Sequence, residues 1–221
     1  FGVFDGIDIP AGEKEYTTAA GFHHATSLRR PGGKSVRLAF GASSGARDSV
    51  TVYLQVPARQ PVVPGTDSVY ILGDTHGEFD AATRILQQVK LIDAGLHWIG
   101  GRKHLVFDGD MMDRGADVTR LLCFVYGLER EAEAAGGKLH VVLGNHETMV
   151  WMGDLRYTNA KELSIAQAYG VAYPKLFDIR ESVLGKWLIT KPAVLRIDNI
   201  LFAHGGVAQD WLAYTPKTFD D

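Results

Sequence analysis

Four short polar motifs lie in order along the chain, and their side chains are of types that bind metal ions and phosphate. The motifs are GDTHG at residues 73–77, GDMMDRG at 109–115, GNHE at 144–147 and HGG at 204–206. Carboxylate, amide and imidazole groups together suit divalent ions of borderline hardness such as Mn, Fe and Zn. The glycines let the backbone turn and approach such ions closely.

Hydrolysis of phosphate esters is the reaction that these side chains suit best. The reaction needs a strong nucleophile at neutral pH and positive charge against an anionic ester. Two divalent ions about 3.5–4 Å apart supply both, because a water that bridges them is acidified and can attack in line with the leaving group. The motifs therefore predict a dinuclear phosphomonoesterase with two Mn, Fe or Zn ions as cofactors.

The expected metal ligands follow from their places in the motifs. Asp110 is central in the motif order, and its two carboxylate oxygens suit a bridging position between two ions. Asp74 and His76 lie two residues apart in a tight turn, so both can face one ion. The Asn145 carbonyl and the His204 imidazole suit the second ion.

Two residues are better placed for proton transfer than for metal binding. His146 directly follows Asn145, so we expect it at the rim of the site, where it can protonate the departing alkoxide. Asp113 is a natural partner that would orient the His146 imidazole and favour its charged form. Together they predict a general-acid dyad.

Substrate phosphate is expected to meet two arginines and an amide. Arg114 offers a planar fork for the phosphate oxygens that are not attacked, and Asn145 lies close enough to contribute. Arg156 is expected to serve as a second anion clamp, because it follows the third motif closely. An ion pair with the neighbouring Asp154 explains Arg156 at least as well.

Short apolar runs precede all four motifs and predict buried strands. They span residues 69–72, 105–107, 141–143 and 200–203. Apolar residues at helical spacing predict helices over about 78–92 and 116–135, between the first three runs. This order predicts parallel strands with crossover helices, whose carboxyl ends deliver the motifs to one edge of a sheet.

The remaining segments divide the chain in two. Residues 1–64 are predicted to be a small β-rich element, with strands over 36–40 and 50–56, and residues 65–221 to be the domain that carries the chemistry. Within that domain we expect a mostly helical insertion over 148–177. A hairpin over 193–203 is expected to deliver the last motif.

Composition excludes several other classes of protein. The 221 residues are 46% hydrophobic and 22% charged, with a net charge of −3 and no basic stripe, which argues against a nucleic-acid surface. No apolar run approaches the roughly 20 residues that span a membrane. The single cysteine, Cys123, excludes an intrachain disulfide and is expected in the core. The chain begins at Phe1, so we expect that an N-terminal segment was removed, and the cellular location stays open.

The motifs resemble the successive signatures of the calcineurin-like metallophosphoesterase superfamily and, within it, of the phosphoprotein phosphatases. The resemblance covers roughly residues 68–207, and GNHETMVWMGDLRYT at 144–158 is most similar to the Shewanella-like phosphatases. It implies a mixed α/β fold, a β-sandwich of two sheets flanked by helices. It also implies the same site: metal ligands Asp74, His76, Asp110, Asn145 and His204, an acid dyad of His146 and Asp113, phosphate binding by Arg114, and a structural role for Glu147.

One feature departs from the family pattern. The family has a further histidine ligand well downstream of HGG, and residues 207–221 contain none. We expect that a C-terminal part is missing from the chain; a weak second site is the alternative. The other histidines lie upstream of the site, and surface or loop positions are expected for them: His23, His24, His97, His104 and His140.

Three functions remain open from the sequence. The first is a protein phosphatase acting on phosphoserine, phosphothreonine or phosphotyrosine. The second is a hydrolase of dinucleoside polyphosphates with the same fold. The third is a binding module whose incomplete site has lost turnover. The expected partners are therefore a phosphorylated protein or a small phosphoester.

Overall fold

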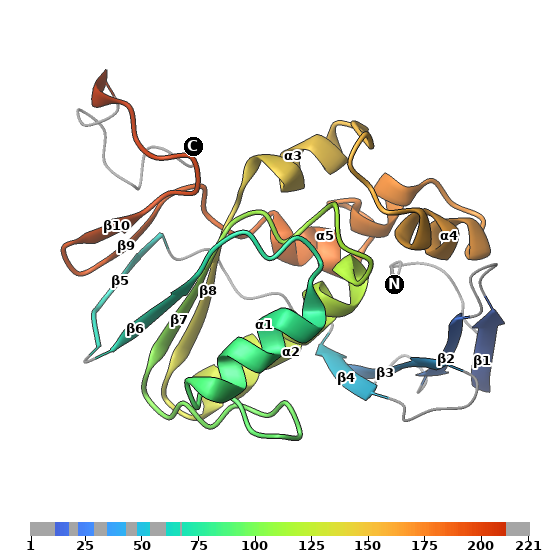
Figure 1. Cartoon of the computed structure of the whole chain (residues 1–221), viewed down its shortest axis with the longest axis horizontal. Coiled ribbons are helices and arrows are strands. Elements are labelled where there is room, and N and C mark those ends of the chain that lie inside the picture. The colour runs from blue at the N-terminus through green and yellow to red at the C-terminus, as the bar shows by residue number, and fades with distance from the viewer. Residues whose placement is uncertain are drawn as a thin grey trace.

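The computed structural model describes the backbone of four N-terminal strands, and residues 61–66 and 68–210 with their side chains. The N-terminal strands form one antiparallel sheet in the order β1-β2-β3-β4, shown in blue in Figure 1. They are β1 (Gly12–Thr17), β2 (Phe22–Leu28), β3 (Ser35–Ala42) and β4 (Asp48–Tyr53). Strands β3 and β4 confirm the two strands expected here, whereas β1 and β2 were not predicted.

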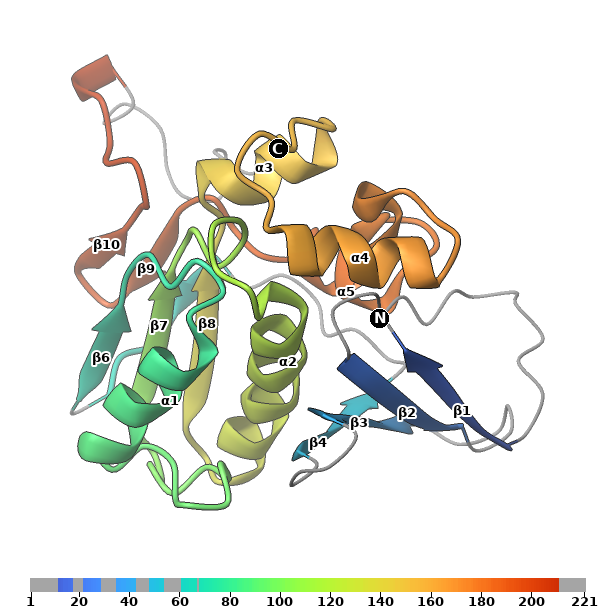
Figure 2. The ribbon, with the colours of Figure 1, turned by 45° about the vertical axis from the view of Figure 1, so that its right-hand side comes forward.

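The central sheet is parallel, as the alternation of strands and helices predicts. Its strands β6 (Val69–Leu72), β7 (His104–Asp108) and β8 (Lys138–Val142) lie in that order. The crossover helices α1 (Phe79–Gln88) and α2 (Val118–Ala134) cover the same face of the sheet (Figure 2), because successive right-handed crossovers run in one direction. Helix α1 ends earlier than expected.

The early end of α1 has a local cause. Lys90 has a φ of 56°, which is the left-handed conformation that ends helices. The N–H of Leu91 then donates to the Leu86 carbonyl at 2.9 Å, so the chain closes the helix end in place of a further turn.

A second sheet covers the other face of the central sheet. In it β9 (Leu195–Ile197) forms the expected hairpin with β10 (Ile200–Phe202), and β5 (Val62–Val63) pairs with β9 in parallel. Buried apolar side chains fill the layer between the sheets: Val63, Val106, Val142, Leu195, Ile197 and Phe202. This arrangement confirms the expected two-sheet sandwich flanked by helices. The boundary at residue 64 stays a prediction, although β5 lies before it and pairs beyond it.

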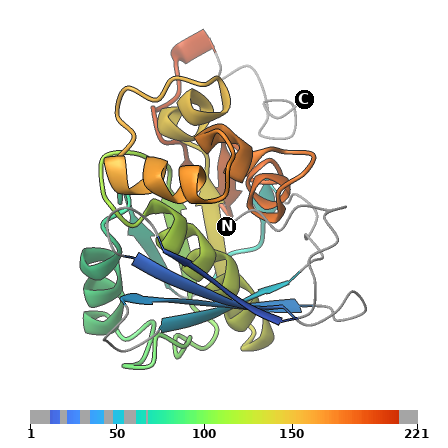
Figure 3. The same cartoon turned by 90° about the vertical axis from the view of Figure 1, so that its right-hand side faces the viewer.

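The helical insertion lies at one end of the sandwich (Figure 3). It comprises α3 (Asn145–Trp151), α4 (Ala160–Ala168), the 3₁₀ helix η1 (Tyr173–Phe177) and α5 (Val183–Leu188), so it starts slightly earlier and ends later than predicted. Its side chains join α1 and α2 in the larger core, where Trp187 packs edge-to-face on Tyr126. Cys123 is buried in this core, as expected.

Two upstream histidines lie in strands of the central sheet and not at the loop or surface positions that were expected. His104 opens strand β7 and is only 5% exposed, so a surface or loop position is wrong for it. His140 lies on β8, and its Nε2 is 3.3 Å from His104 Nδ1. Each stands two residues before a valine of the layer between the sheets, and side chains two apart on a strand share a face. His97 is exposed, as expected.

Among residues 61–66 and 68–210, no helix has the length and apolar character needed to cross a membrane. The carboxyl ends of β6, β7 and β8 lead directly into the first three motifs, at the edge of the sheet where α3 begins. Strand β10 leads into the fourth motif at the same edge.

Candidate metal centre

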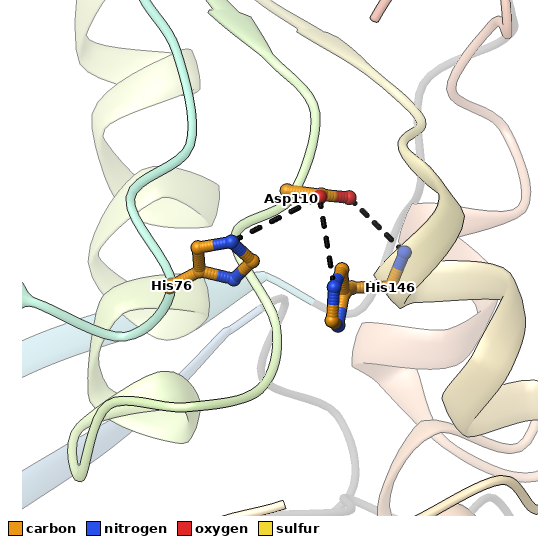
Figure 4. Close-up of side chains that lie close together, drawn as sticks. All are labelled: His76, Asp110 and His146. Atoms are coloured by element: carbon orange, nitrogen blue, oxygen red, sulfur yellow. Dashed lines mark hydrogen bonds and ion pairs between the residues drawn. The ribbon is translucent and has the colours of Figure 1, made fainter. Parts of the chain in front are cut away.

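Asp110 is the centre of a cluster of three histidines. The Oδ2 atom of this buried aspartate lies 3.1 Å from His204 Nε2 and 3.9 Å from the Nε2 atoms of His76 and His146. Its Oδ1 atom accepts the backbone N–H of His146 at 3.0 Å. Figure 4 shows His76, from the loop after β6, and His146, from the start of α3, facing Asp110. The first three motifs thus meet at one carboxylate, and the fourth joins them through His204.

Asp74 links two of these histidines at the exposed side of the cluster. Its Oδ2 is 3.8 Å from His76 Nε2, and its Oδ1 is 3.8 Å from His204 Nδ1. Two sets of three potential ligands result, each with ligand atoms within 4.8 Å of one another: His76, Asp110 and His146, and Asp74, Asp110 and His204. Asp110 belongs to both sets, which is the position that a bridging ligand would take.

The hydrogen bonds of two histidines fit a site for cations. His76 Nδ1 lies 2.8 Å from the Met112 carbonyl and His204 Nδ1 lies 2.7 Å from the Asp108 carbonyl, so both nitrogens carry the proton and donate. Histidine ligands usually hold their second nitrogen in this way. Within the described residues, His76 Nε2 is buried without a hydrogen-bond partner. A buried lone pair beside two carboxylates is suited to a divalent ion, so the residues fit the cofactor that the motifs predict.

Close approach of the backbone to site residues explains two of the motif glycines. A Cβ atom on Gly144 would lie 2.2 Å from Asp110 Oδ1 and 2.6 Å from Asp110 N. Gly109 has a φ of 82°, and a Cβ atom there would meet the His204 ring at 2.6 Å. Both positions therefore require glycine for the cluster to close.

The pKa values of three groups in and around the cluster are raised. Burial lowers the pKa of His204, but the bond to the Asp108 carbonyl and the charges of Asp110 and Asp74 outweigh burial, and the pKa is raised. Burial raises the pKa of Asp108. Burial also raises the pKa of Glu147, although the hydrogen bonds that its carboxylate accepts from backbone N–H groups act in the opposite direction.

His146, a member of the cluster, also forms a buried pair with Asp113. His146 Nδ1 lies 2.8 Å from Asp113 Oδ2, and the Asp113 side chain has no exposed surface. A carboxylate only accepts, so Nδ1 carries a proton. Arg114 Nη2 lies 3.4 Å from His146 Nε2, and Arg114 is exposed, so its guanidinium can meet a ligand from solvent.

Asp113 and Arg114 both have left-handed backbone conformations, with φ values of 67° and 62°. Such conformations are uncommon for residues other than glycine and persist where surrounding contacts hold them. Here the Gly115 N–H donates to the His76 carbonyl at 2.8 Å, which ties this loop to the first motif.

Two expected site residues have contacts outside the two ligand sets. Asn145 is exposed at the first position of α3, directly before His146, and its Nδ2 contacts Met149 Sδ at 3.8 Å, so its role as a ligand through the carbonyl oxygen stays a prediction. Arg156 is 72% exposed at its side chain, and its guanidinium forms a forked pair with Asp154, with contacts of 2.7 and 2.9 Å. The local ion pair that the sequence allowed is therefore present, and the role of Arg156 as a second anion clamp stays a prediction.

Sequence reasoning missed the residues that support the dyad. Thr158 Oγ1 donates to Asp113 Oδ1 at 2.9 Å, and Asn159 Nδ2 donates to the Arg114 carbonyl at 3.0 Å. Both lie 45 residues from their partners, so no local spacing predicts them. The only available signal is that Thr158 closes the stretch that resembles the Shewanella-like phosphatases.

Comparison with known proteins agrees with this geometry. The profile of the calcineurin-like phosphoesterase family matches residues 68–221. The chain belongs to this family. Among curated calcineurin-like phosphoesterases, Shewanella-like protein phosphatase 2 of Arabidopsis thaliana is 39% identical over 102 residues, which are 46% of this chain and 26% of the relative. Shewanella-like protein phosphatase 1 of Plasmodium berghei is 31% identical over 140 residues, 63% of this chain and 39% of the relative.

A solved structure of a phosphatase has a similar fold. The cold-active protein-tyrosine phosphatase of a psychrophilic Shewanella species superposes with a TM-score of 0.73 at 28% identity, over 94% of this chain and 65% of that protein. These relatives confirm the resemblance of the chain to the Shewanella-like phosphatases. The chain spans 26% to 65% of the length of these three proteins.

Proposed function

We propose that the protein is a phosphatase that hydrolyses phosphate monoesters with two divalent metal ions. The observation that carries the proposal is that Asp74, His76 and His204 meet around the Asp110 carboxylate. Among the described residues, His76 Nε2 is buried there without a hydrogen-bond partner. These four residues would hold the ions, and Asn145, which precedes His146 at the start of α3, would add its carbonyl oxygen. Ions bound there would acidify a water molecule and offset the charge of the phosphate.

The residues beside the cluster have distinct proposed roles. Arg114 is exposed next to His146, so its fork would bind the phosphate oxygens that are not attacked. His146 would donate the proton from Nε2 to the leaving oxygen as the P–O bond breaks. Asp113 would hold the other ring nitrogen and stabilise the imidazolium before that transfer. The buried setting of the pair limits access of water to this proton.

Phosphoproteins are the proposed substrates. The support is the similarity to proteins named as protein phosphatases, including a protein-tyrosine phosphatase with the same fold. The second candidate, hydrolysis of dinucleoside polyphosphates, has support from the symmetrical bis(5'-nucleosyl)-tetraphosphatase of a Janthinobacterium strain. That protein is 27% identical over 154 residues, which are 66% of this chain and 46% of the relative.

A comparison of kcat/KM values between substrates tests the two candidate functions directly. The purified protein, loaded with Mn²⁺, would be assayed with phosphotyrosine and phosphoserine peptides and with diadenosine tetraphosphate. We expect a kcat/KM for at least one phosphopeptide that exceeds the value for diadenosine tetraphosphate. The reverse order would favour the second candidate. Absence of turnover on all three, with fewer than two ions bound per chain, would favour the binding module.

Asp110→Asn tests the metal centre itself. The amide keeps the shape of the side chain but removes the negative charge shared by both ligand sets, so we expect loss of bound metal and of activity with an unchanged circular dichroism spectrum. Asp93→Asn is the matched control, because Asp93 accepts the His97 N–H in the loop after α1. Retention of two ions and of near-native turnover by Asp110→Asn would refute the shared-ligand role.

His146→Gln tests the general acid. We expect kcat on alkyl phosphates to fall by about 10²–10⁴-fold, the range for a lost general acid. Aryl phosphates with acidic leaving groups need no protonation and should lose much less. An equal loss across the leaving-group series would remove His146 from this role.

A further inference from the structure

A short segment after α3, residues 157–159, forms hydrogen bonds with the loop that carries Asp113 of the dyad. Thr158 Oγ1 donates to Asp113 Oδ1 at 2.9 Å, and the Arg114 N–H donates to the Tyr157 carbonyl at 2.8 Å. Asn159 Nδ2 donates to the Arg114 carbonyl at 3.0 Å. The three contacts fall on two adjacent residues whose left-handed backbone needs outside support. Residues 157–159 therefore hold the dyad loop at both its backbone and its side chain.

The two oxygens of Asp113 are divided between two partners. Oδ2 pairs with His146 Nδ1 at 2.8 Å, while Oδ1 accepts the Thr158 hydroxyl. The carboxylate is wholly buried, so solvent cannot take the place of either partner. Its torsion is therefore fixed at both ends, and the direction of the His146 ring follows from it. The ring in turn places Nε2 toward Asp110 and Arg114.

We propose that Thr158 is a positioning residue for His146, acting through the Asp113 carboxylate. The hydroxyl keeps Oδ2 in line with Nδ1, so the ring holds its orientation and presents Nε2 to the leaving oxygen. The inference rests on the proposed phosphatase function. Thr158 itself exchanges no proton: the electron pair of the breaking P–O bond goes to the leaving oxygen, which takes the Nε2 proton. His146 is then neutral, with a proton still on Nδ1 and hydrogen-bonded to Asp113.

A purely structural role for Thr158 is the competing explanation. The Thr158 N–H donates to the Leu155 carbonyl at 3.1 Å, so the residue also closes a turn, and its side chain is only half-buried. In that case loss of the hydroxyl would lower stability and leave the chemistry of the leaving group unchanged. The two explanations therefore differ in a kinetic measurement that stability does not affect.

Thr158→Val tests the proposal, because valine keeps the shape and removes the hydroxyl. We expect kcat on an alkyl phosphate to fall by about 10- to 100-fold with little change in KM, the scale for a misplaced catalytic group. The loss on p-nitrophenyl phosphate should be several times smaller, since that leaving group needs no proton. Thr158→Ser retains the hydroxyl and should recover most of the loss.

Thr190→Val is the matched control. Its hydroxyl is also half-buried and donates to the Trp187 carbonyl at 2.6 Å, at the end of α5. This variant should have the wild-type kcat on both the alkyl phosphate and p-nitrophenyl phosphate. Equal losses on the alkyl and aryl substrates in Thr158→Val, or a loss that Thr158→Ser does not recover, would overturn the positioning role.

A second measurement separates failure of this inference from failure of the proposed function. The His146 Nδ1 proton, which is hydrogen-bonded to the buried Asp113 carboxylate, should give a downfield resonance in the proton NMR spectrum, whether or not the protein turns over substrate. We expect this resonance to be present in the wild type and in Thr158→Ser, and broadened or shifted in Thr158→Val. If the wild type lacks phosphatase activity but the resonance changes as expected, the positioning contact stands and the proposed function fails. An unchanged resonance in Thr158→Val overturns the contact.

Discussion

Glu147 holds the backbone of Asp110 in place. Glu147 Oε2 accepts the Asp110 N–H at 3.1 Å, and Oε1 accepts the next two N–H groups, of Met111 at 2.8 Å and Met112 at 3.1 Å. The same Oε2 accepts the Gly144 N–H at 2.7 Å. One buried carboxylate thereby fixes the loop that carries the central aspartate relative to the start of α3.

Glu147→Gln should therefore disturb the centre without touching a proposed ligand. The amide group offers one acceptor oxygen in place of two, and its NH₂ group would face N–H donors. Each buried N–H left without an acceptor costs about 1–3 kcal/mol. We expect a lower midpoint of chemical denaturation and a metal affinity reduced by roughly 10- to 100-fold, as for other residues that support ligands.

Calorimetric metal titration and urea denaturation measure these two effects. The exposed Glu133, near the end of α2, supplies the matched control Glu133→Gln, which should change neither. If Glu147→Gln binds metal with wild-type affinity, the loop is held by other contacts and the supporting role is wrong.

Gly144→Ala tests the close approach of α3 to Asp110. The added methyl group would overlap Asp110 Oδ1 and N, so either the loop or the helix must move. The φ of Gly144 is −99°, which any residue adopts, so steric overlap is the sole expected cause. We expect a loss of metal affinity of about 10-fold or more with retained secondary structure.

Gly153→Ala separates overlap from backbone strain. Gly153 has a φ of 80° with open space around its Cβ position, so alanine there is strained but overlaps nothing. It should reduce stability and leave metal affinity unchanged. Equal metal affinities for Gly144→Ala and the wild type would show that the approach is looser than 2.2 Å.

The strands and the edge of the sheet that carries the site could be predicted from the sequence, because both depend on local patterns. Runs such as 69–72 and 105–107 are apolar and β-branched, and a polar motif directly follows each one. The sandwich was available from the family resemblance. The burial of His104 was not predictable, since it depends on a second sheet whose β9–β10 hairpin lies more than 90 residues further along the chain.

Side-chain partners in the site were the least predictable part. Asp113 takes Thr158 from a loop 45 residues away, and such a contact exists only once α3 and α4 are packed. Arg156 had two candidate partners, and spacing does not decide between a distant phosphate and a carboxylate two residues away. The structure pairs it with Asp154.

Arg156→Lys now has a different expected outcome from that of an anion clamp. Because Asp154 holds the guanidinium at an exposed position, lysine should keep a weaker version of the same pair. We expect KM for a phosphopeptide and Ki for inorganic phosphate to match the wild type. Arg114→Lys, measured alongside, should raise both constants. A rise of both constants in Arg156→Lys would show that the arginine leaves Asp154 when substrate binds.

Glu162 predicts how the stability of the protein depends on pH. This α4 residue is 1% exposed, and its carboxylate accepts the Thr119 hydroxyl at 2.5 Å and the Thr119 N–H at 3.2 Å, at the start of α2. Burial raises the pKa of Glu162 to about 7, above the usual 4.5, despite the opposing effect of both bonds. The folded protein therefore binds this proton more tightly than the unfolded chain does.

The sign of the effect follows from that difference. The stabilisation from protonated Glu162 is fully present below about pH 4.5 and is lost as the pH rises through 7, so the charged carboxylate destabilises the fold above pH 7. Glu162→Gln is neutral at every pH, and its amide can contact both Thr119 groups, because a hydroxyl also accepts. Relative to the wild type, the free energy of unfolding of the variant should rise by roughly 3 kcal/mol between low pH and pH 8. Urea denaturation at pH 5 and pH 8 measures this gain, with exposed Glu181→Gln as the control. A difference between variant and wild type that is the same at both pH values would mean that Glu162 titrates near its usual pKa.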